Sequence, residues 1–244
     1  VVLLDDPLLK LCQWFHFEDP RLDEAVQLYA EVYEKRRKSY GDDHPLTLGS
    51  GGQLAAAYNT LDRPAEAEPL LRRELEVRKT RGKGDSVEAL TVRVVLATSL
   101  QKLDRYDEAV AIADEAIALE HGNPTRDTVA ARNAKAMALF RSGRVQDSKR
   151  MWDEALALAP EAMGTEHPNY ASILASSANA DLALGDVQGA RHKLENALVA
   201  LKGKQGPKHP TTRAAAQRLI EIYERLGMQS QATALRAEFP VAAK

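Results

Sequence analysis

The apolar residues of this chain recur at helical spacing, and the same arrangement returns several times along its length. In the clearest copy, one helical stripe consists of Leu54, Ala55, Tyr58 and Leu61. After a turn at residues 62–64, a second stripe consists of Ala67, Leu70, Leu71 and Leu75. Residues spaced at i, i+3, i+4 and i+7 share one face of a helix, so each copy predicts two amphipathic helices joined by a tight turn. The sequence shows no strand-like alternation.

Two markers show that these helix pairs repeat at a step of about 42 residues. Glycines mark the junctions between pairs, at Gly41, Gly84, Gly122, Gly164 and Gly206. A small residue lies near the start of each second helix, at Ala25, Ala67, Ala109, Ser148, Ala190 and Ala232. A fixed period of this size is typical of stacked supersecondary units, and it favours a binding surface over a catalytic site as the expected function.

The pattern predicts an all-α fold, an α-solenoid of about six helix-turn-helix units. The expected first helices of the units are 6–17, 46–61, 87–103, 126–142, 168–184 and 210–226. The expected second helices are 20–40, 64–81, 106–121, 145–159, 187–202 and 229–238. The units then span 6–43, 44–84, 85–122, 123–164, 165–206 and 207–240, and residues 241–244 form a tail.

One polar residue interrupts the expected core. Asp181 falls where Tyr58 and Tyr223 lie in their own units. A carboxylate is costly to bury unless it is paired. We therefore expect the helix to be rotated so that Leu182 packs inward and Asp181 reaches solvent.

The motif Leu54-Ala55-Tyr58…Ala67-Leu71 resembles the tetratricopeptide repeat, which alternates large, small and aromatic positions in its first helix and small and bulky ones in its second. The 42-residue step and the Gly-x-x-His-Pro junctions at Gly41, Gly164 and Gly206 are similar to the long repeats of kinesin light chains and their bacterial relatives. The resemblance covers residues 18–240. The last unit also resembles the tails of bacterial multidomain signalling proteins, including some serine/threonine kinases.

The resemblance implies a right-handed superhelix whose first helices line a concave groove for a peptide or protein segment. Carried over by register, the expected groove residues are Gly49, Gly52, Asn59, Thr98, Gln101, Asn133, Met137, Phe140, Arg141, Asn179, Gln217 and Glu221. The paired asparagines of kinesin light chains and the basic clamp of chaperone adaptors are both missing as patterns. This groove is built of small, amide and apolar groups, which favours an extended and mainly uncharged segment whose backbone bonds to Asn and Gln side chains.

The glycines of Gly49-Ser50-Gly51-Gly52 lie inside an expected helix, where each costs about 1 kcal/mol relative to alanine. Two interpretations remain open. Gly49 and Gly52 clear space for a ligand backbone, or the helix is locally frayed or kinked and its neighbours tolerate this. In the second case, Gly52→Ala raises stability and leaves binding unchanged.

Nothing in the sequence predicts catalysis, a cofactor or a metal site. The chain has no Walker-type phosphate loop, no Gly-x-Ser-x-Gly elbow and no His-Glu-x-x-His motif. The His-Pro pairs at 44–45, 167–168 and 209–210 recur too far apart in a solenoid to share one zinc ion. We expect each proline to start a helix and each histidine to lie at its N-cap.

Charge also bears on the choice of partner. The formal net charge is −2, which gives no overall attraction to nucleic acid or anionic lipid. Basic runs at 35–38, 78–81 and 202–204 end several second helices, where cations favour the helix dipole. An acidic partner or RNA is the alternative for these runs, and RNA binding is favoured only if they form a contiguous surface.

The apolar segment 1–17 is the expected first helix of the array and a possible docking surface for preceding sequence or a second copy of the chain. Charged residues interrupt this apolar run, and the segment lacks the features of a signal peptide or of a membrane-spanning helix. With Cys12 as the single cysteine, a reducing, cytoplasmic location is expected. We expect a non-enzymatic protein-binding scaffold; the alternative is a regulatory or oligomerisation arm of a larger signalling protein, such as one linked to a kinase.

Overall fold

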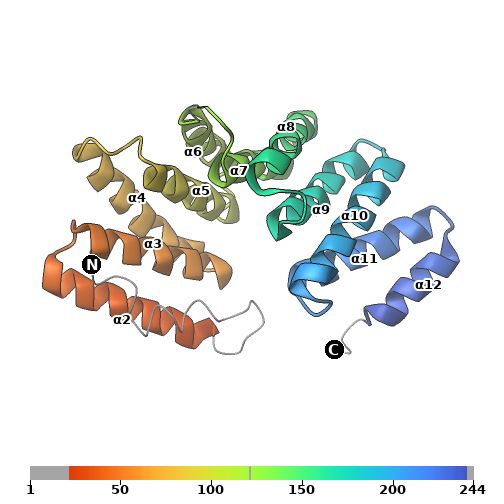
Figure 1. Cartoon of the computed structure of the whole chain (residues 1–244), viewed down its shortest axis with the longest axis horizontal. Helices are drawn as coiled ribbons and strands as arrows, with labels where there is room; N and C mark the ends of the chain where they lie inside the picture. Colours follow the sequence, from red (N-terminus) through yellow and green to blue (C-terminus); the bar gives the residue numbers. More distant parts are fainter. Residues whose placement is uncertain (1–21, 121, 241–244) are drawn as a thin grey trace. The chain divides into compact units, whose positions relative to one another are not determined.

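The computed structural model describes residues 22–120 and 122–240, which form eleven helices and contain no strand. The expected helix 6–17, the docking segment 1–17 and the tail 241–244 lie outside these residues. The chain divides into two compact parts, Val1–Glu120 and His121–Lys244, which we call the N-terminal and C-terminal parts. Figure 1 shows that each part is a series of helical hairpins.

Every helix of a part packs on the helix that follows it in sequence, as expected for a solenoid. The N-terminal part contains α2 (Leu22–Tyr40), α3 (Pro45–Thr60), α4 (Pro64–Thr80), α5 (Val87–Lys102) and α6 (Tyr106–Ala118). The C-terminal part contains α7 (Arg126–Arg141), α8 (Val145–Met163), α9 (Pro168–Ala183), α10 (Val187–Gln205), α11 (Pro210–Arg225) and α12 (Gln229–Glu238). First helices of neighbouring repeats also touch, α3 against α5 and α7 against α9.

The His-Pro pairs start helices in the way that the sequence predicted. In His44, His167 and His209, the ring Nδ1 accepts a hydrogen bond from the backbone N–H two residues later, at 3.1–3.2 Å. The proline then occupies the first helical turn, where its missing N–H has no cost. Ser86 and Thr125 take the same capping role before α5 and α7.

The turn inside each repeat depends on one residue with left-handed backbone geometry. These residues are Asp62, Asp104, Gly143, Gly185 and Gly227, with φ between 57° and 87°. All five lie in the short gaps that the sequence predicted between the first and second helices of a unit. After each turn the small residue of the second helix is completely buried, as at Ala67, Ala109 and Ser148, which lets the two helices approach closely.

Two second helices are longer than predicted. We expected α8 to end at residue 159 before Pro160, but it continues to Met163 and ends at Gly164, where φ is 81°. A proline inside a helix lacks the N–H of the ladder and crowds the preceding turn, but the helix continues here, and the Pro160 carbonyl accepts from the Gly164 N–H at 3.0 Å. Likewise α10 passes the expected end at residue 202 and continues through Gly203 to Gln205.

The prediction that Asp181 reaches solvent was wrong. Asp181 is 1% exposed, and each of its two carboxylate oxygens lies against a lysine. Lys149 Nζ of α8 is 3.1 Å from Oδ1, and Lys193 Nζ of α10 is 2.7 Å from Oδ2. The neighbouring Leu182 is half-buried and packs against the core. The helix therefore buries Asp181 and part of Leu182 at the same time. The ion pairs compensate the carboxylate and join three consecutive helices.

No helix among the described residues combines the length and the apolar character needed to cross a bilayer.

Candidate protein-binding groove

A hollow of about 340 Å³ lies between α3, α4 and α5 in the N-terminal part. We call it the α3–α5 pocket. Its lining consists of Gly49, Gly52, Gln53, Ala56, Leu71, Glu74, Arg78, Glu88, Thr91, Val92 and Val95. Two of the expected groove residues, Gly49 and Gly52, are therefore placed together at one concave site.

Small side chains on α3 produce this hollow. Gly49, Gly52 and Ala56 follow one another at intervals of three and four residues, so they share a helical face. Helix α3 is continuous from Pro45 to Thr60 and shows no break at the glycines, which does not support the interpretation of a frayed helix. A β-carbon added to Gly49 would meet no atom within 4 Å, whereas one added to Gly52 would lie 2.9 Å from Glu74 Oε2.

Glu74 of α4 is the buried polar group of the α3–α5 pocket, and it is only 2% exposed. Its Oε1 accepts hydrogen bonds from Arg78 Nε at 3.0 Å and Arg78 Nη2 at 2.6 Å. Its Oε2 is buried and has no hydrogen-bond partner. Burial raises the pKa of the Glu74 carboxyl, an effect that the Arg78 hydrogen bonds oppose but do not cancel.

The sequence reasoning did not select Glu74, although the internal repeats contain a signal for it. The corresponding positions of the following three repeats are Ala116, Ala155 and Ala197, all completely buried. The second repeat thus places a carboxylate where the following three repeats bury a methyl group. The residue facing it is also unusual, because Gly52 corresponds to Val94, Asn133, Ala175 and Gln217 in the other repeats.

Alanine substitution is expected to change the stability of the protein by different amounts at the two glycines. We expect Gly49→Ala to raise the free energy of unfolding by about 0.5–1 kcal/mol, because the new methyl group meets open space and alanine is the better helix former. Gly52→Ala should gain less, since its β-carbon forces Glu74 away from its present position. Urea unfolding monitored by circular dichroism measures both changes. An equal gain in stability at the two positions would contradict the close contact between residue 52 and Glu74. When Glu74 is also replaced by alanine, Gly52→Ala should give the same gain in stability as Gly49→Ala.

The remaining expected groove residues of the N-terminal part do not line the α3–α5 pocket. Asn59 is 7% exposed, and its Nδ2 donates to Ser99 Oγ at 2.8 Å, which joins α3 to α5. The carbonyl of Asn59 accepts from Lys102 Nζ at 2.8 Å. Thr98 and Gln101 are half-buried, and the Thr98 hydroxyl donates to the Val94 carbonyl at 3.0 Å. The structure therefore uses the Asn59 amide to hold neighbouring repeats together.

In the C-terminal part, three expected groove residues take part in packing. Asn133 Oδ1 accepts a hydrogen bond from Trp152 Nε1 at 2.9 Å. The Phe140 and Trp152 rings lie 5.8 Å apart between centroids, and Met137 packs on the same core cluster. These side chains are half-buried, so each offers only part of its surface to a ligand.

Three of the last four expected groove residues are exposed. Asn179 is half-buried, and Arg141 is exposed. Gln217 and Glu221 are exposed on α11, and Gln217 Nε2 donates to Glu221 Oε1 at 3.3 Å.

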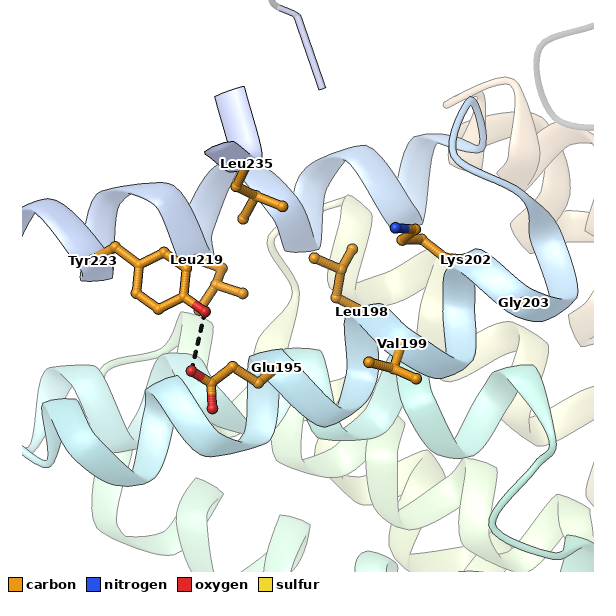
Figure 2. A pocket seen from close by; sticks show the side chains of 8 residues that line it. All are labelled: Glu195, Leu198, Val199, Lys202, Gly203, Leu219, Tyr223 and Leu235. Carbon is orange, nitrogen blue, oxygen red and sulfur yellow. Dashed lines mark hydrogen bonds between the residues drawn. The ribbon is translucent and has the colours of Figure 1, made fainter. Parts of the chain in front are cut away.

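A second hollow, of about 520 Å³, lies between α10, α11 and α12 (Figure 2). Its walls are mostly apolar and include Leu198, Leu219 and Leu235, and the Tyr223 hydroxyl donates to Glu195 Oε1 at 3.0 Å. Helix α12 has 10 residues against 19 in α10, so it covers only part of its neighbour. Sequence reasoning missed this hollow because it considered only the first helices as binding surfaces.

The described residues contain no group of three His, Cys, Asp or Glu side chains that could hold a metal ion.

A tetratricopeptide repeat model matches residues 15–80 and 49–120, and a second tetratricopeptide repeat model matches residues 128–169. No curated protein matches the chain in sequence.

Two solved structures illustrate the similarity of fold. BtubC (BKLC) from P. vanneervenii is 21% identical with a TM-score of 0.69, and the match covers 89% of each chain. A putative kinesin light chain from Podosopora anserina with nearly identical TPR-like repeats is 23% identical with a TM-score of 0.61. That match covers 81% of this chain and 95% of the other. At these identities the likeness establishes the solenoid fold.

Proposed function

Because the chain belongs to the tetratricopeptide repeat family, we propose that it is a protein–protein interaction scaffold that binds an extended segment of its partner along the first helices. Repeat proteins of this kind generally bind protein partners through the surfaces that stacking leaves open. Catalysis is not part of the proposal, since the tetratricopeptide repeat is typically a non-enzymatic scaffold. We include a cytoplasmic location and a role in signalling in the same proposal.

The observation that supports this proposal most directly is the α3–α5 pocket. In this pocket Gly49 and Gly52, which have no side chains, line the same hollow as the exposed amide of Gln53. A backbone can approach α3 closely there, and a side-chain amide can donate to or accept from a peptide group. These features suit an extended segment recognised mainly through its backbone.

Site-specific photocrosslinking tests the proposal. A benzophenone side chain introduced at Gln53 should capture a protein partner from cell extract. The same group at Ala111, an exposed position of α6 outside the pocket, serves as the matched control. The captured protein is then purified and its affinity for the unmodified chain is measured.

A blocking variant completes this test. Gly49→Phe should weaken binding of the purified partner at least tenfold, because the added ring projects into the pocket and meets no atom at its β-carbon that would disturb the fold. Ala111→Phe should leave the affinity unchanged. Equal crosslinking from both positions, or equal affinity of both phenylalanine variants, would reject the first-helix surface as the binding site.

The RNA-binding alternative depended on a contiguous basic surface at the helix ends, and the contacts of two basic runs disfavour it. At the end of α2, Arg36 Nη1 donates to Ser50 Oγ at 2.6 Å, and Arg37 Nη2 is 3.1 Å from Glu34. At the end of α4, the guanidinium of Arg78 is bound to Glu74. Several of these cations are thus already paired within the protein, which leaves less free positive charge for phosphates.

The alternative function, a regulatory or oligomerisation arm of a larger protein, was inferred from residues 1–17, which lie outside the described residues. It remains a prediction of the sequence, and sedimentation of the chain with and without this segment tests it.

A further inference from the structure

The α3–α5 pocket contains a buried carboxylate oxygen whose hydrogen-bonding capacity is unused. Glu74 Oε1 is fully engaged by Arg78, but Oε2 has no partner. An unsatisfied buried acceptor is costly, and natural structures seldom keep one without a reason. The three following repeats avoid this cost with a buried alanine at the same position. The carboxylate therefore requires an explanation beyond the packing of the solenoid.

The charges around the pocket favour a cationic ligand. Two carboxylates, Glu74 and Glu88, face a single guanidinium, Arg78, whose Nη1 is 3.7 Å from Glu88 Oε2. The lining therefore carries one net negative charge at neutral pH. A ligand group that donates a hydrogen bond and carries a positive charge would bind the free acceptor and neutralise the net negative charge of the lining.

The shape of the pocket restricts which cation fits. A volume of about 340 Å³ is near the lower limit for ligand pockets, which suits one side chain rather than a larger molecule. Leu71, Val92 and Val95 supply apolar walls against which the methylene stem of a lysine can pack. A guanidinium offers five donors in a planar fork, so one free oxygen matches an ammonium group better.

We propose that the α3–α5 pocket receives a lysine side chain of the partner protein, with its ammonium group donating to Glu74 Oε2 and its stem against Leu71, Val92 and Val95. The absence of a side chain at Gly52, directly beside Oε2, leaves the carboxylate free to adjust toward the incoming group. This inference depends on the proposed function and specifies the chemistry of the segment that is bound.

The proposal implies a pH dependence of binding. Burial raises the pKa of Glu74, so the carboxyl takes up a proton at a higher pH than an exposed glutamate does. Once protonated, it no longer attracts an ammonium group, and binding should weaken as the pH falls through this raised pKa. The charged groups that face Glu74 are Arg78 on its own helix and Glu88 on α5, and α3 contributes no titratable residue to the lining.

A titration with a minimal ligand tests the proposal on the whole chain. Nα-acetyl-lysine methylamide is added to ¹⁵N-labelled protein, and amide shifts of Gly49 and Gly52 are followed by NMR. The matched probe is Nα-acetyl-norleucine methylamide, which has the same stem without the ammonium group. We expect saturable shifts with the lysine probe and at least tenfold weaker binding of the norleucine probe. Equal binding of the two probes would overturn the proposal, whatever the variants do.

Two variants locate the effect at Glu74. Glu74→Gln preserves the size of the side chain and an acceptor for Arg78, and it should weaken the lysine probe about tenfold. Glu74→Ala gives this repeat the alanine of the three following repeats and should abolish the response. Gly203→Ala in α10, where an added β-carbon meets no atom, should behave like the wild type. Unchanged binding in both Glu74 variants would exclude this carboxylate.

The outcome can be separated from that of the proposed function. If the partner still crosslinks from residue 53 and binds Glu74→Ala with unchanged affinity, the scaffold function stands and the lysine inference fails. If residue 53 captures nothing above the residue 111 control but the lysine probe still distinguishes wild type from Glu74→Ala, the pocket binds an ammonium group that is not part of a partner on this groove.

Discussion

Replacing Trp152 with alanine is expected to lower the free energy of unfolding of the C-terminal part by about 3–5 kcal/mol. Trp152 is completely buried and is the largest fully buried side chain among the described residues. It packs in a cluster that includes Val129, Ala155 and Ile173, and therefore joins α7, α8 and α9. Removal leaves a cavity that these rigid helix contacts cannot close, and this adds to the lost transfer free energy.

The indole nitrogen provides an internal control for this prediction. Asn133→Ala removes the acceptor of Trp152 Nε1 and should cost only about 1–3 kcal/mol, since the ring stays in place with an unsatisfied donor. Urea unfolding monitored by circular dichroism gives both values. Trp152→Ala must be the more harmful of the two; similar losses would mean that the hydrogen bond, rather than the buried volume, supports the cluster. Because Asn133 supports the core, its substitution is also a poor test of ligand binding.

Replacing Asp181 with alanine is expected to cost about 3 kcal/mol, the lower end of the range for breaking a buried ion pair. The substitution removes the buried carboxylate between Lys149 and Lys193, whose ammonium groups keep Asp153 as an ion-pair partner at 3.0 Å and 3.8 Å. The lysine side chains are 34% and 20% exposed, so they can regain some hydration, which keeps the loss at the lower end. Thermal or urea unfolding measures the change.

A double-mutant cycle with Lys193→Met separates the ion pair from simple packing. If the pair is the source of stability, the combined loss should be smaller than the sum of the single losses by about 1 kcal/mol or more. Strict additivity would show that Asp181 acts only through its volume. Asp181→Leu is a further control, because well-packed apolar residues often replace buried ion pairs without loss.

The helical framework was predictable from local patterns. The N-caps at His44, His167 and His209 and the turns at Asp62 and Asp104 all follow from backbone rules that involve a few neighbouring residues. The repeated stripe spacing then fixed which faces are buried. At Pro160, the rule that a proline ends a helix was given too much weight, and the end of α8 was predicted four residues too early.

The polar contacts were less predictable, because they join side chains on different helices that are far apart in the sequence. Asn59 was expected to face a ligand, but its amide bonds to Ser99 of the next repeat. Asp181 was expected in solvent, but lysines of the two adjacent second helices compensate its charge. Glu74 was overlooked, although its buried position follows from the register that it shares with Ala116, Ala155 and Ala197.

The sequence by itself determined most of the helices, their caps and the turns, since each depends on hydrogen bonds and apolar spacing within one or two turns of chain. The period of about 42 residues indicated that the repeats stack. Only the tertiary structure decided which polar groups are satisfied. The free energy of a buried amide or carboxylate depends on whether a partner from another helix reaches it, as at Asn59 and Asp181, or leaves an acceptor open, as at Glu74 Oε2.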